Sequence, residues 1–506
     1  MEAWGKYGSV EVWKYGRFIY EFSNYHQLST VNRQPKKDFD AIVVGSGPNG
    51  LAAAITLQKA GLSVLILEAN SVAGGGMRSA EITLPGFTHD ICSAVHPMGA
   101  DSPFFRSLPL ADHGLKFLYP EIPLAHPFED GTALALIPSL QEMADSLGED
   151  AQAYLKLMQP LVNSWEGIQN DVLSPLHFPK HPMDMAAFGW RALSSASRLS
   201  KRFKSEKTRT FWGGLSLHSQ LPFDWMASSA IGLVLLTVGH KRGWPVAEGG
   251  SQSIANALVS LFISLGGKIE LNYTVTSLDQ LPSSRAVLLD VTPVQLLEIA
   301  GRRLSPLYRR QLKKFRYGMG VFKIDWALAE CIPFKSELSK NAGTIHLGGS
   351  FKEMEAAEMD AWSGRLTKRP GIILAQQSIV DPGRAPIGKH TGWAYCHVPR
   401  GSVADLTDTI EDQVERFAPG FRERILARHT INTEELEEQN ANYHGGDIGG
   451  GANNLSQLFT RPALRSAPYR SSAKGIYLCS SSTPPGGGVH GMCGYNAAKR
   501  VLKDLF

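Results

Sequence analysis

Apolar and polar positions divide the first part of the chain into a strand, a helix and a second strand. Residues 39–44 (FDAIVV) and 62–67 (LSVLIL) are short apolar runs, as expected of strands that are buried on both faces of a parallel sheet. Residues 51–60 are mostly small and apolar, and Gly61 follows them, which is typical of a helix and its C-terminal cap. Residues 38–70 therefore predict a strand–helix–strand unit.

The pattern changes further along the chain. Helical spacing dominates residues 101–241. Its clearest stretches are 140–147, 151–168 and 183–203, and the apolar run 225–239 predicts a buried helix. Residues 316–395 instead alternate β-branched and aromatic runs, which predicts an antiparallel sheet. A mixed layer of helices and strands is thus expected outside the strand–helix–strand unit.

The first predicted strand runs directly into a glycine-rich turn, GSGPNG, at residues 45–50. Gly45 permits a tight turn, Gly47 lets backbone N–H groups approach a diphosphate, and Gly50 allows close packing of the helix on the strand. The other predicted binding residues of the turn are Pro48 and Asn49. Because a helix N-terminus presents unpaired N–H donors to an anion, this context predicts a dinucleotide site.

An acidic residue stands where the second predicted strand ends. Glu68 follows Gly50 by 18 positions, close to the spacing of about 20 residues at which such an acid accepts the hydroxyl groups of the adenosine ribose. Its charge also disfavours a 2′-phosphate. We expect Glu68 and its neighbour Ala69 to belong to the dinucleotide site.

A second glycine cluster follows at once, in residues 73–78 (AGGGMR). It resembles the glycine doublet of FAD enzymes more than the corresponding loop of a simple NAD dehydrogenase. The residues expected to contact the cofactor here are Gly74, Gly75, Gly76, Met77 and Arg78, with Arg78 available as a counter-charge. Since the chain contains no second strand–GxGxxG–helix unit, the cofactor expected is FAD, without a separate NAD(P) domain.

Several separated blocks resemble the phytoene desaturase-like (carotenoid desaturase-type) FAD oxidoreductases. The blocks are residues 45–51, 74–78, 84–87, 90–97, 243–250, 254–269 and 475–491. Within that family the chain is most similar to the branch of pyridine nucleotide-disulfide oxidoreductase domain-containing protein 2. The resemblance implies an FAD-dependent enzyme, with Val275 beside the adenine end of FAD and a C-terminal turn beside the flavin. The residues it implies in that turn are Ser481, Gly487, Gly488 and Val489.

The sequence departs from the family pattern at two places. Ser480 and Ser482 stand where relatives usually carry glycine. The stretch 275–290 is short and lacks part of a β-hairpin found in relatives. Both departures affect the fit around the cofactor.

These patterns together predict an α/β fold in which a Rossmann-type FAD-binding domain is assembled from discontinuous segments. A mixed helix-and-antiparallel-sheet domain is expected to cover the flavin and hold the substrate. The expected boundaries are 1–37 for an aromatic-rich N-terminal extension, 38–100, 242–315 and 470–506 for the FAD-binding domain, and 101–241 and 316–469 for the substrate domain.

The resemblance implies an oxidoreductase that takes a hydride from a C–H bond of an apolar, isoprenoid or lipid-like substrate. Two alternatives stay open: a flavin-dependent isomerase or amine oxidase on the same scaffold, or a flavin-binding regulatory protein with little turnover. Hydride transfer to a flavin needs no strong acid or base, so no catalytic residue is assigned. His490, beside the C-terminal turn, is the first candidate for proton transfer, and a structural hydrogen bond is its other interpretation.

Composition excludes several other classes. The five cysteines are scattered, and no metal-ligand spacing is present, so neither a disulfide framework nor a metal site is expected. A net charge of +4 on 506 residues gives no reason to expect a nucleic-acid partner. The N-terminal residues carry Glu2, Glu11 and Glu21, which fits neither a secretory signal nor a transit peptide. A cytoplasmic or organelle-matrix protein is therefore expected.

A strongly basic run, Arg191–Arg209, has Trp190 and Phe203 beside it, and Arg302–Arg316 forms a second basic cluster. One interpretation is peripheral contact with an anionic membrane, and the other is a solvated helix face. The sequence leaves the oligomeric state open.

Overall fold

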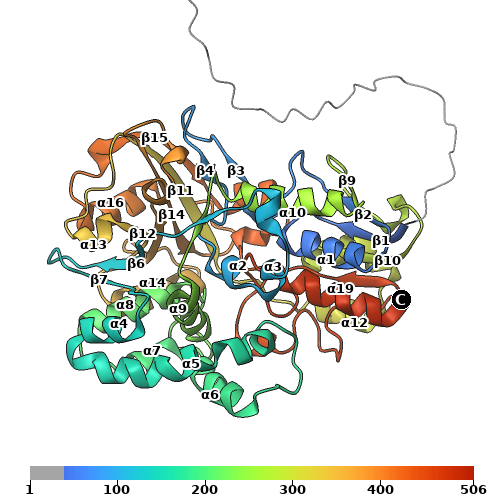
Figure 1. The fold of residues 1–506 in the computed structure, drawn as a ribbon, viewed down its shortest axis with the longest axis horizontal. Helices are drawn as coiled ribbons and strands as arrows, with labels where there is room; N and C mark the ends of the chain where they lie inside the picture. The colour runs from blue at the N-terminus through green and yellow to red at the C-terminus, as the bar shows by residue number, and fades with distance from the viewer. Residues whose placement is uncertain (1–38) are drawn as a thin grey trace, which may run out of the picture. The chain divides into compact units, whose positions relative to one another are not determined.

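The computed structural model describes residues 39–506, and two sheets organise them (Figure 1). The predicted N-terminal extension lies outside the described residues. The first sheet is parallel throughout, in the order β16-β10-β1-β2-β9. Its strands are β1 (Phe39–Val44), β2 (Val64–Leu67), β9 (Lys268–Glu270), β10 (Ser284–Leu289) and β16 (Ile476–Leu478). Strands far apart in the sequence thus pair side by side around β1.

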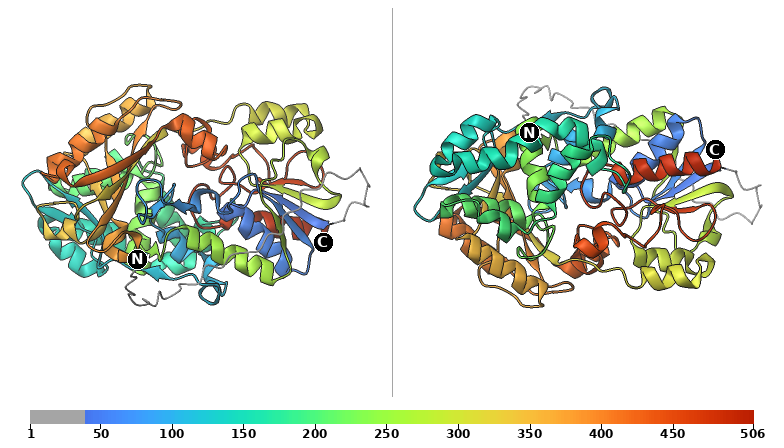
Figure 2. Two further views of the ribbon diagram at one scale, coloured as in Figure 1. Left: turned by 90° about the horizontal axis from the view of Figure 1, so that it is seen from above. Right: turned by 90° about the horizontal axis from the view of Figure 1, so that it is seen from below.

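Helices cover both faces of this parallel sheet, as Figure 2 shows from two sides. On one face Ala41 and Val43 pack beneath α1 (Pro48–Lys59), α10 (Gln252–Ser264) and α19 (Met492–Leu505). On the other face Ile42 and Val44 pack with α11 (Pro293–Ala300) and α12 (Pro306–Leu312). Successive side chains of a strand point to opposite faces, so a strand that is covered on both sides must be apolar at every position. This is why residues 41–44 form an unbroken apolar run.

The second sheet has seven strands in the order β15-β11-β14-β13-β12-β6-β7. They are β6 (Ile122–Pro127), β7 (Ala133–Ala135), β11 (Gly320–Leu328), β12 (Ala342–Leu347), β13 (Ile372–Ala375), β14 (His390–Val398) and β15 (Ile425–Ile431). All neighbours pair antiparallel except β6 and β12, which are parallel. The strands of the first sheet come from segments assigned to the FAD-binding domain, and those of the second from the other segments. The domain boundaries themselves remain a proposal.

The two faces of the second sheet are covered differently. Helix α16 (Thr407–Phe417) packs on one face through Ile410 and Val414. Helices on the other face form the largest apolar cluster with Trp393 and Tyr395 of β14. These helices are α4 (Leu140–Ser146), α5 (Ala151–Val172), α6 (Pro182–Ala192), α7 (Ala196–Ser200), α8 (Glu206–Leu217), α9 (Ala230–Arg242) and α14 (Phe351–Trp362). The predicted mixture of helices and antiparallel sheet is therefore present.

Some element predictions were incomplete. The stretch 183–203 is two helices, α6 and α7, because Ser195 caps a new helix by accepting a hydrogen bond from the Arg198 N–H group at 3.1 Å. The helical prediction for 101–241 also missed β6, whose two prolines disguise a strand. The predicted buried helix in the apolar run 225–239 is α9, which begins at Ala230. Among residues 39–506, no helix is both long and apolar enough to cross a bilayer.

Short elements complete the fold. The helices are α2 (Pro97–Asp101), α3 (Pro103–Arg106), α13 (Glu337–Lys340), α15 (Gln377–Val380), α17 (Thr433–Gln439) and α18 (Leu455–Leu458). Two small ribbons pair β3 (Ser79–Ala80) with β4 (His89–Asp90), and β5 (Phe117–Leu118) with β8 (Val246–Ala247). Between β9 and β10 the chain forms a single 3-10 turn and no strand, at the place where a hairpin was expected to be shortened.

Candidate functional site

A cavity of about 1420 Å³ is lined by residues of both sheets and their helices. We call its cofactor side the part lined by the glycine turn, β2 and the C-terminal turn. Its substrate side is the part lined by α9, by strands β12, β13 and β14, and by His218 and Gln220, which follow α8. One continuous space thus joins the predicted dinucleotide site to the apolar residues of the second sheet and of α9.

The glycine turn has the geometry that its sequence predicts. Gly45 has a φ of +99°, a left-handed conformation that favours glycine, and its N–H group donates to the Leu67 carbonyl at 2.8 Å. A β-carbon at Gly50 would lie 2.1 Å from the Gly45 carbonyl oxygen, so only glycine lets α1 begin here. A β-carbon at Gly75 would lie 3.0 Å from the Gly47 Cα atom. The two glycine segments are therefore in contact and offer bare backbone to a ligand.

Glu68 points toward the glycine turn. Its Oε2 atom accepts hydrogen bonds from the Ser46 N–H group at 2.8 Å and the Ser46 hydroxyl at 2.6 Å. Its Oε1 atom accepts from the backbone and side-chain amides of Asn70 at 2.9 and 3.0 Å. A carboxylate has about four acceptor positions, so these donors fill them all. A ribose hydroxyl that binds Glu68 must replace one of them, and the rotatable Ser46 hydroxyl is the simplest to displace.

The C-terminal turn meets the glycine turn from β16. Asn49 donates from Nδ2 to the Ser481 hydroxyl at 3.3 Å, while its buried Oδ1 atom has no protein partner among the described residues. A β-carbon at Gly494 would lie 1.8 Å from the Asn49 carbonyl oxygen, so α19 and α1 touch backbone to backbone. An unpaired buried acceptor beside two bare glycine segments suits a ligand that carries hydroxyl groups and a diphosphate.

The substrate side is apolar and uncharged. Its apolar wall includes Ile231, Val234, Leu235, Ile373 and Trp393, whereas its polar members are His218, Gln220, Thr344 and the hydroxyl of Tyr395. Burial lowers the pKa of His218 to about 3, so the ring is neutral at neutral pH. Its Nε2 atom lies 2.8 Å from Nε2 of His346, an interaction that requires one ring to donate and the other to accept. No acidic residue of α8, α9 or the sheet lines this side.

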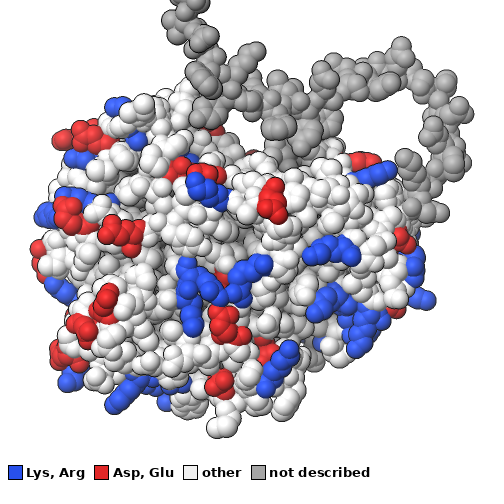
Figure 3. Space-filling model, viewed as in Figure 1, with Lys and Arg blue, Asp and Glu red and all other residues white. Residues whose placement is uncertain are grey.

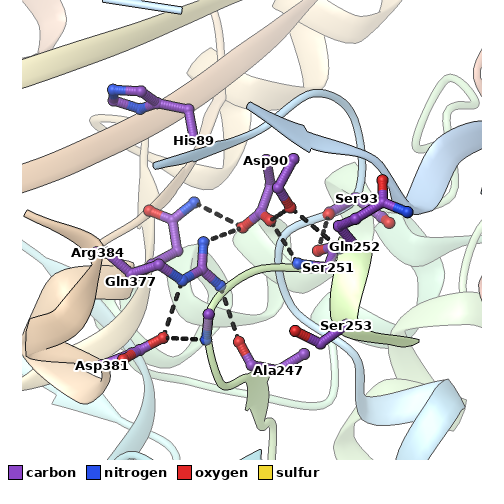
Figure 4. A network of polar contacts seen from close by, with 12 residues as sticks. His89, Asp90, Ser93, Ala247, Ser251, Gln252, Ser253, Gln377, Asp381 and Arg384 are labelled. Carbon is purple, nitrogen blue, oxygen red and sulfur yellow. Dashed lines mark hydrogen bonds and ion pairs between the residues drawn. The ribbon is translucent and has the colours of Figure 1, made fainter. Parts of the chain in front are cut away.

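A buried ion-pair network joins the two halves of the site (Figure 4). The guanidinium of Arg384 lies 2.9 Å from Asp90 and 3.0 Å from Asp381. Asp90 also accepts from the Ser251 N–H group at 2.8 Å, and Asp381 accepts from the Gly249 N–H group at 2.7 Å. Burial raises the pKa of Asp90, but the charge of Arg384 and the hydrogen bond from Ser251 outweigh it and hold that pKa below its ordinary value. The network fixes the start of α10 against the second sheet.

Known proteins agree with this architecture. Residues 43–108 match a family model described as an NAD(P)-binding Rossmann-like domain. The mouse pyridine nucleotide-disulfide oxidoreductase domain-containing protein 2 is 28% identical over 562 residues, covering 94% of this chain and 95% of that protein. The neurosporene-forming phytoene desaturase of Rhodobacter capsulatus is 25% identical, covering 90% of this chain and 92% of that protein. A putrescine oxidase structure superposes with a TM-score of 0.58 at 17% identity, covering 93% of this chain and 99% of that one.

The resemblance to phytoene desaturase-like oxidoreductases is confirmed. The predicted fold class is confirmed with it, as a parallel Rossmann-type sheet beside an antiparallel-rich sheet in the manner of FAD-dependent oxidoreductases. FAD as the expected cofactor agrees with this class. The comparisons do not extend to the substrate, which the likeness in fold leaves open.

The structure brings most of the predicted binding residues to the cavity. Those that line it are Gly45, Gly47, Pro48, Asn49, Glu68, Ala69, Gly75, Gly76, Val275, Ser481, Gly487, Gly488 and Val489. Gly50, Gly74 and Met77 do not line the cavity, although their neighbours in the sequence do. Arg78 does not line the cavity either, because its guanidinium donates to the carbonyl oxygens of Gly75 at 3.0 Å and Gln439 at 3.1 Å. Arg78 thus stabilises the second glycine segment, residues 73–78, by linking it to the Gln439 carbonyl.

The serines that replace family glycines have partners of their own. The Ser480 hydroxyl donates to the Val291 carbonyl and the Ser482 hydroxyl to the Gly450 carbonyl, both at 2.7 Å. His490 lines the cavity, and its Nδ1 atom accepts from the Met492 N–H group at 3.0 Å, at the start of α19. Burial lowers the pKa of His490 to about 4. This geometry favours the structural interpretation of His490.

Sequence reasoning missed two buried charged residues close to the site. Asp290, directly after β10, accepts a hydrogen bond from the Gly50 N–H group at 2.8 Å. Lys323 of β11 is buried against Asp325 and lies 5.9 Å from the ring of Trp393. The signal for Asp290 was the one used for Glu68, an acid at the carboxyl end of an apolar run. Lys323 gave no comparable signal, since one lysine in a strand usually faces solvent.

Proposed function

We propose that this chain is an FAD-dependent oxidoreductase that removes a hydride from a C–H bond of an apolar, isoprenoid or lipid-like substrate. The observation that carries the proposal is the single cavity that joins a dinucleotide site to an apolar, uncharged wall. Bound FAD supplies the hydride acceptor. The work left to the chain is to bind the cofactor, to position the substrate and to exclude water.

The proposed cofactor contacts divide by chemistry. The backbone of residues 45–49 and 75–76 holds the diphosphate, with Gly50 and Gly74 directly behind it, and Glu68 binds the adenosine ribose after the Ser46 hydroxyl turns away. Val275 lies at the adenine end, and Ser481, Gly487, Gly488 and Val489 lie beside the flavin. Since α1 directs its N-terminus and positive dipole end into this turn, an anion here is stabilised without a lysine or arginine.

The apolar wall selects the substrate. A bound alkyl or polyene chain would cover Ile231, Val234 and Leu235 of α9 and Ile373 of β13, and each buried methylene contributes about 0.8 kcal/mol. His96, His218 and His490 have pKa values lowered by burial to between about 3 and about 4, so they are weak bases. None is assigned proton transfer.

The amine oxidase alternative is less well supported by this wall. A protonated amine that enters an apolar cavity needs a carboxylate partner to offset its desolvation, and neither α9 nor the second sheet provides one on the substrate side. Asp171 of α5 lines the cavity elsewhere, but it already accepts from the Lys180 N–H group at 3.1 Å and lies 2.8 Å from Nε2 of His177. Isomerisation on the same scaffold and low-turnover flavin binding are separate outcomes of the test below.

The proposed route of an apolar substrate starts at a membrane surface. Leu176, Phe178, Met183 and Trp190 are 71, 85, 86 and 69% exposed, and Leu176 and Pro179 also line the cavity. The exposed charged residues of the same stretch, 176–202, are Lys180, Arg198, Lys201, Arg202 and one acid, Asp184, and Arg198 lies over the Trp190 ring. We call the four exposed apolar residues Leu176, Phe178, Met183 and Trp190 the entrance patch. Apolar side chains flanked by lysine and arginine suit an anionic lipid surface.

The basic run 191–209 does not form one continuous basic surface. Phe203 is buried, and Arg191 and Arg209 donate to backbone carbonyls. On the face drawn in Figure 3, basic and acidic side chains lie side by side, unlike the continuous basic track that nucleic acid requires. A peripheral protein of the cytoplasm or an organelle matrix is the proposed setting.

The test is to purify the full chain, identify any extracted cofactor by mass spectrometry, and mix the FAD-loaded protein anaerobically with polyenes, lipids and amines. We expect the visible absorbance of the flavin to bleach with an apolar substrate and a desaturated product to form. Bleaching only with amines would establish the oxidase alternative. An isomerised product without net bleaching would establish the isomerase. A flavin that stays oxidised with every donor would favour the regulatory alternative, and a protein that takes up no flavin would refute the proposal.

A further inference from the structure

A buried carboxyl group sits on the concave side of the glycine turn. Asp290 follows β10 and is 6% exposed, and its Oδ2 atom accepts from the Gly50 N–H group at 2.8 Å. A β-carbon at Gly47 would lie 2.9 Å from that same oxygen, and one at Gly45 would lie 3.1 Å from the Asp290 β-carbon. The turn is therefore wrapped around the Asp290 side chain.

The backbone holds this carboxyl group in place. The Asp290 N–H group donates to the Val44 carbonyl at 2.8 Å, and the Asn442 side chain donates to the Asp290 carbonyl at 2.8 Å. Asp290 also lines the same cavity as Gly45, Gly47 and Glu68. A ligand in the turn thus meets Asp290 at a fixed position.

The N-terminus of α1 would stabilise the negative charge of both Asp290 and a bound diphosphate. The N-terminus of α1 stabilises nearby negative charge through its free N–H groups and its dipole, and Asp290 already occupies the Gly50 donor. Two negative charges at one helix N-terminus repel each other. Glu68 adds a third negative charge at the same place, so ionised Asp290 opposes anion binding here.

The surroundings favour the neutral form of Asp290. Burial raises its pKa to about 7, the Gly50 hydrogen bond lowers it and the charge of Glu68 raises it. The other titratable groups that act with it are the thiols of Cys479, directly after β16, and Cys493 on α19. Burial raises the pKa of both thiols, so they stay neutral around neutral pH.

We propose that Asp290 is a positioning residue whose ionisation loosens the hold of the glycine turn on the diphosphate of the cofactor. The inference rests on the proposed FAD binding. An anion bound beside Asp290 raises the affinity of its carboxyl group for a proton. By linkage, cofactor binding then takes up a proton, and the affinity falls as the pH rises above about 7.

The experiment measures FAD affinity by quenching of flavin fluorescence between about pH 6 and about pH 9 in wild type, Asp290→Asn and Asp279→Asn. Asparagine keeps an acceptor for Gly50 but carries no charge, and Asp279 is an exposed acid that serves as the matched control. We expect wild type and Asp279→Asn to lose up to about tenfold in affinity per pH unit above about pH 7, and Asp290→Asn to bind almost independently of pH. Equal slopes in all three proteins would overturn the inference.

A second measurement needs only the wild-type chain. Calorimetric titration of FAD near neutral pH, in two buffers of different ionisation enthalpy, counts the protons bound with the cofactor. Net proton uptake is expected, and FAD binding with no uptake would overturn the inference while leaving the proposed function intact. Failure of all proteins to bind FAD at any pH would instead overturn the proposed function, and this inference with it.

Discussion

Glu68 accepts two hydrogen bonds from Ser46, one from its backbone N–H group and one from its hydroxyl. The pair ties the end of β2 to the glycine turn after β1, so the acid and the turn form one surface. The hydrogen bond from the Ser46 N–H group sets the position of the carboxylate. The Ser46 hydroxyl occupies an acceptor position on Glu68 that a ribose hydroxyl could occupy instead.

Replacement of Glu68 should therefore matter more than replacement of its partner. We expect Glu68→Gln to weaken FAD binding by about ten- to hundredfold, the effect of losing charged hydrogen bonds to the ribose. Ser46→Ala should change the affinity by less than about tenfold, because ribose replaces its hydroxyl. Fluorescence titration measures both. Equal affinities of Glu68→Gln and wild type would place the ribose elsewhere.

The close approach at Gly50 makes a prediction about folding. A β-carbon at Gly50 would lie 2.1 Å from the Gly45 carbonyl oxygen, so Gly50→Ala should lower the free energy of unfolding by about 1–3 kcal/mol and disrupt FAD uptake. Gly301→Ala is the matched control, since a β-carbon there meets no atom within 4 Å and its φ of −53° suits alanine. The control should be unchanged or up to about 1 kcal/mol more stable in chemical denaturation. A stable, flavin-binding Gly50→Ala variant would contradict this account.

The buried network of Figure 4 makes a prediction about stability and pH. Arg384→Met leaves the buried carboxylate of Asp90 without its partner, which should lower the free energy of unfolding by about 3–5 kcal/mol. Arg365→Met breaks only an exposed pair with Asp360 and should cost no more than about 1 kcal/mol. Because the pKa of Asp90 is lower in the folded chain than its ordinary 3.8, its contribution is present above that pH and is lost as the pH falls below it. Denaturation in acid and at neutral pH checks both variants, and similar losses in the two would be inconsistent with a buried, paired Arg384.

Much of the first sheet could be predicted from the sequence, and less of the second. The run 39–44 and the turn at 45–50 follow a strict geometric rule, because a β-carbon at Gly50 has no room. In contrast, β6 contains two prolines and is a strand only because β12 and β7 pair with it, and no local pattern shows those partners. Arg78 was expected to face the cofactor, but the nearby carbonyl of Gln439 comes from 361 positions along the chain, a contact that spacing alone does not reveal.

His490 should act as a cap and not as a proton-transfer group. His490→Asn places an amide oxygen where Nδ1 accepts from Met492, so we expect stability within about 1 kcal/mol of wild type and an unchanged pH dependence of kcat. A proton-transfer role would instead abolish one limb of the pH–rate profile. Stopped-flow measurement of flavin bleaching over a range of pH separates the two interpretations.

The entrance patch should direct the chain to anionic lipid. Phe178 and Met183 are the two most exposed of its side chains, so the double replacement Phe178→Ser and Met183→Ser removes apolar surface without opening the core. Each side chain contributes up to about 1.5–3 kcal/mol when it leaves water, so the double variant should bind vesicles containing phosphatidylserine at least about tenfold more weakly. Ile387→Ser is the control, because Ile387 is an exposed apolar side chain that does not belong to the entrance patch. Both variants should oxidise a detergent-solubilised substrate at the wild-type rate, since neither change reaches the substrate side. Vesicle flotation in low and high salt gives the measurement, and equal flotation of the double variant and wild type would mean that the substrate enters without membrane contact at this patch.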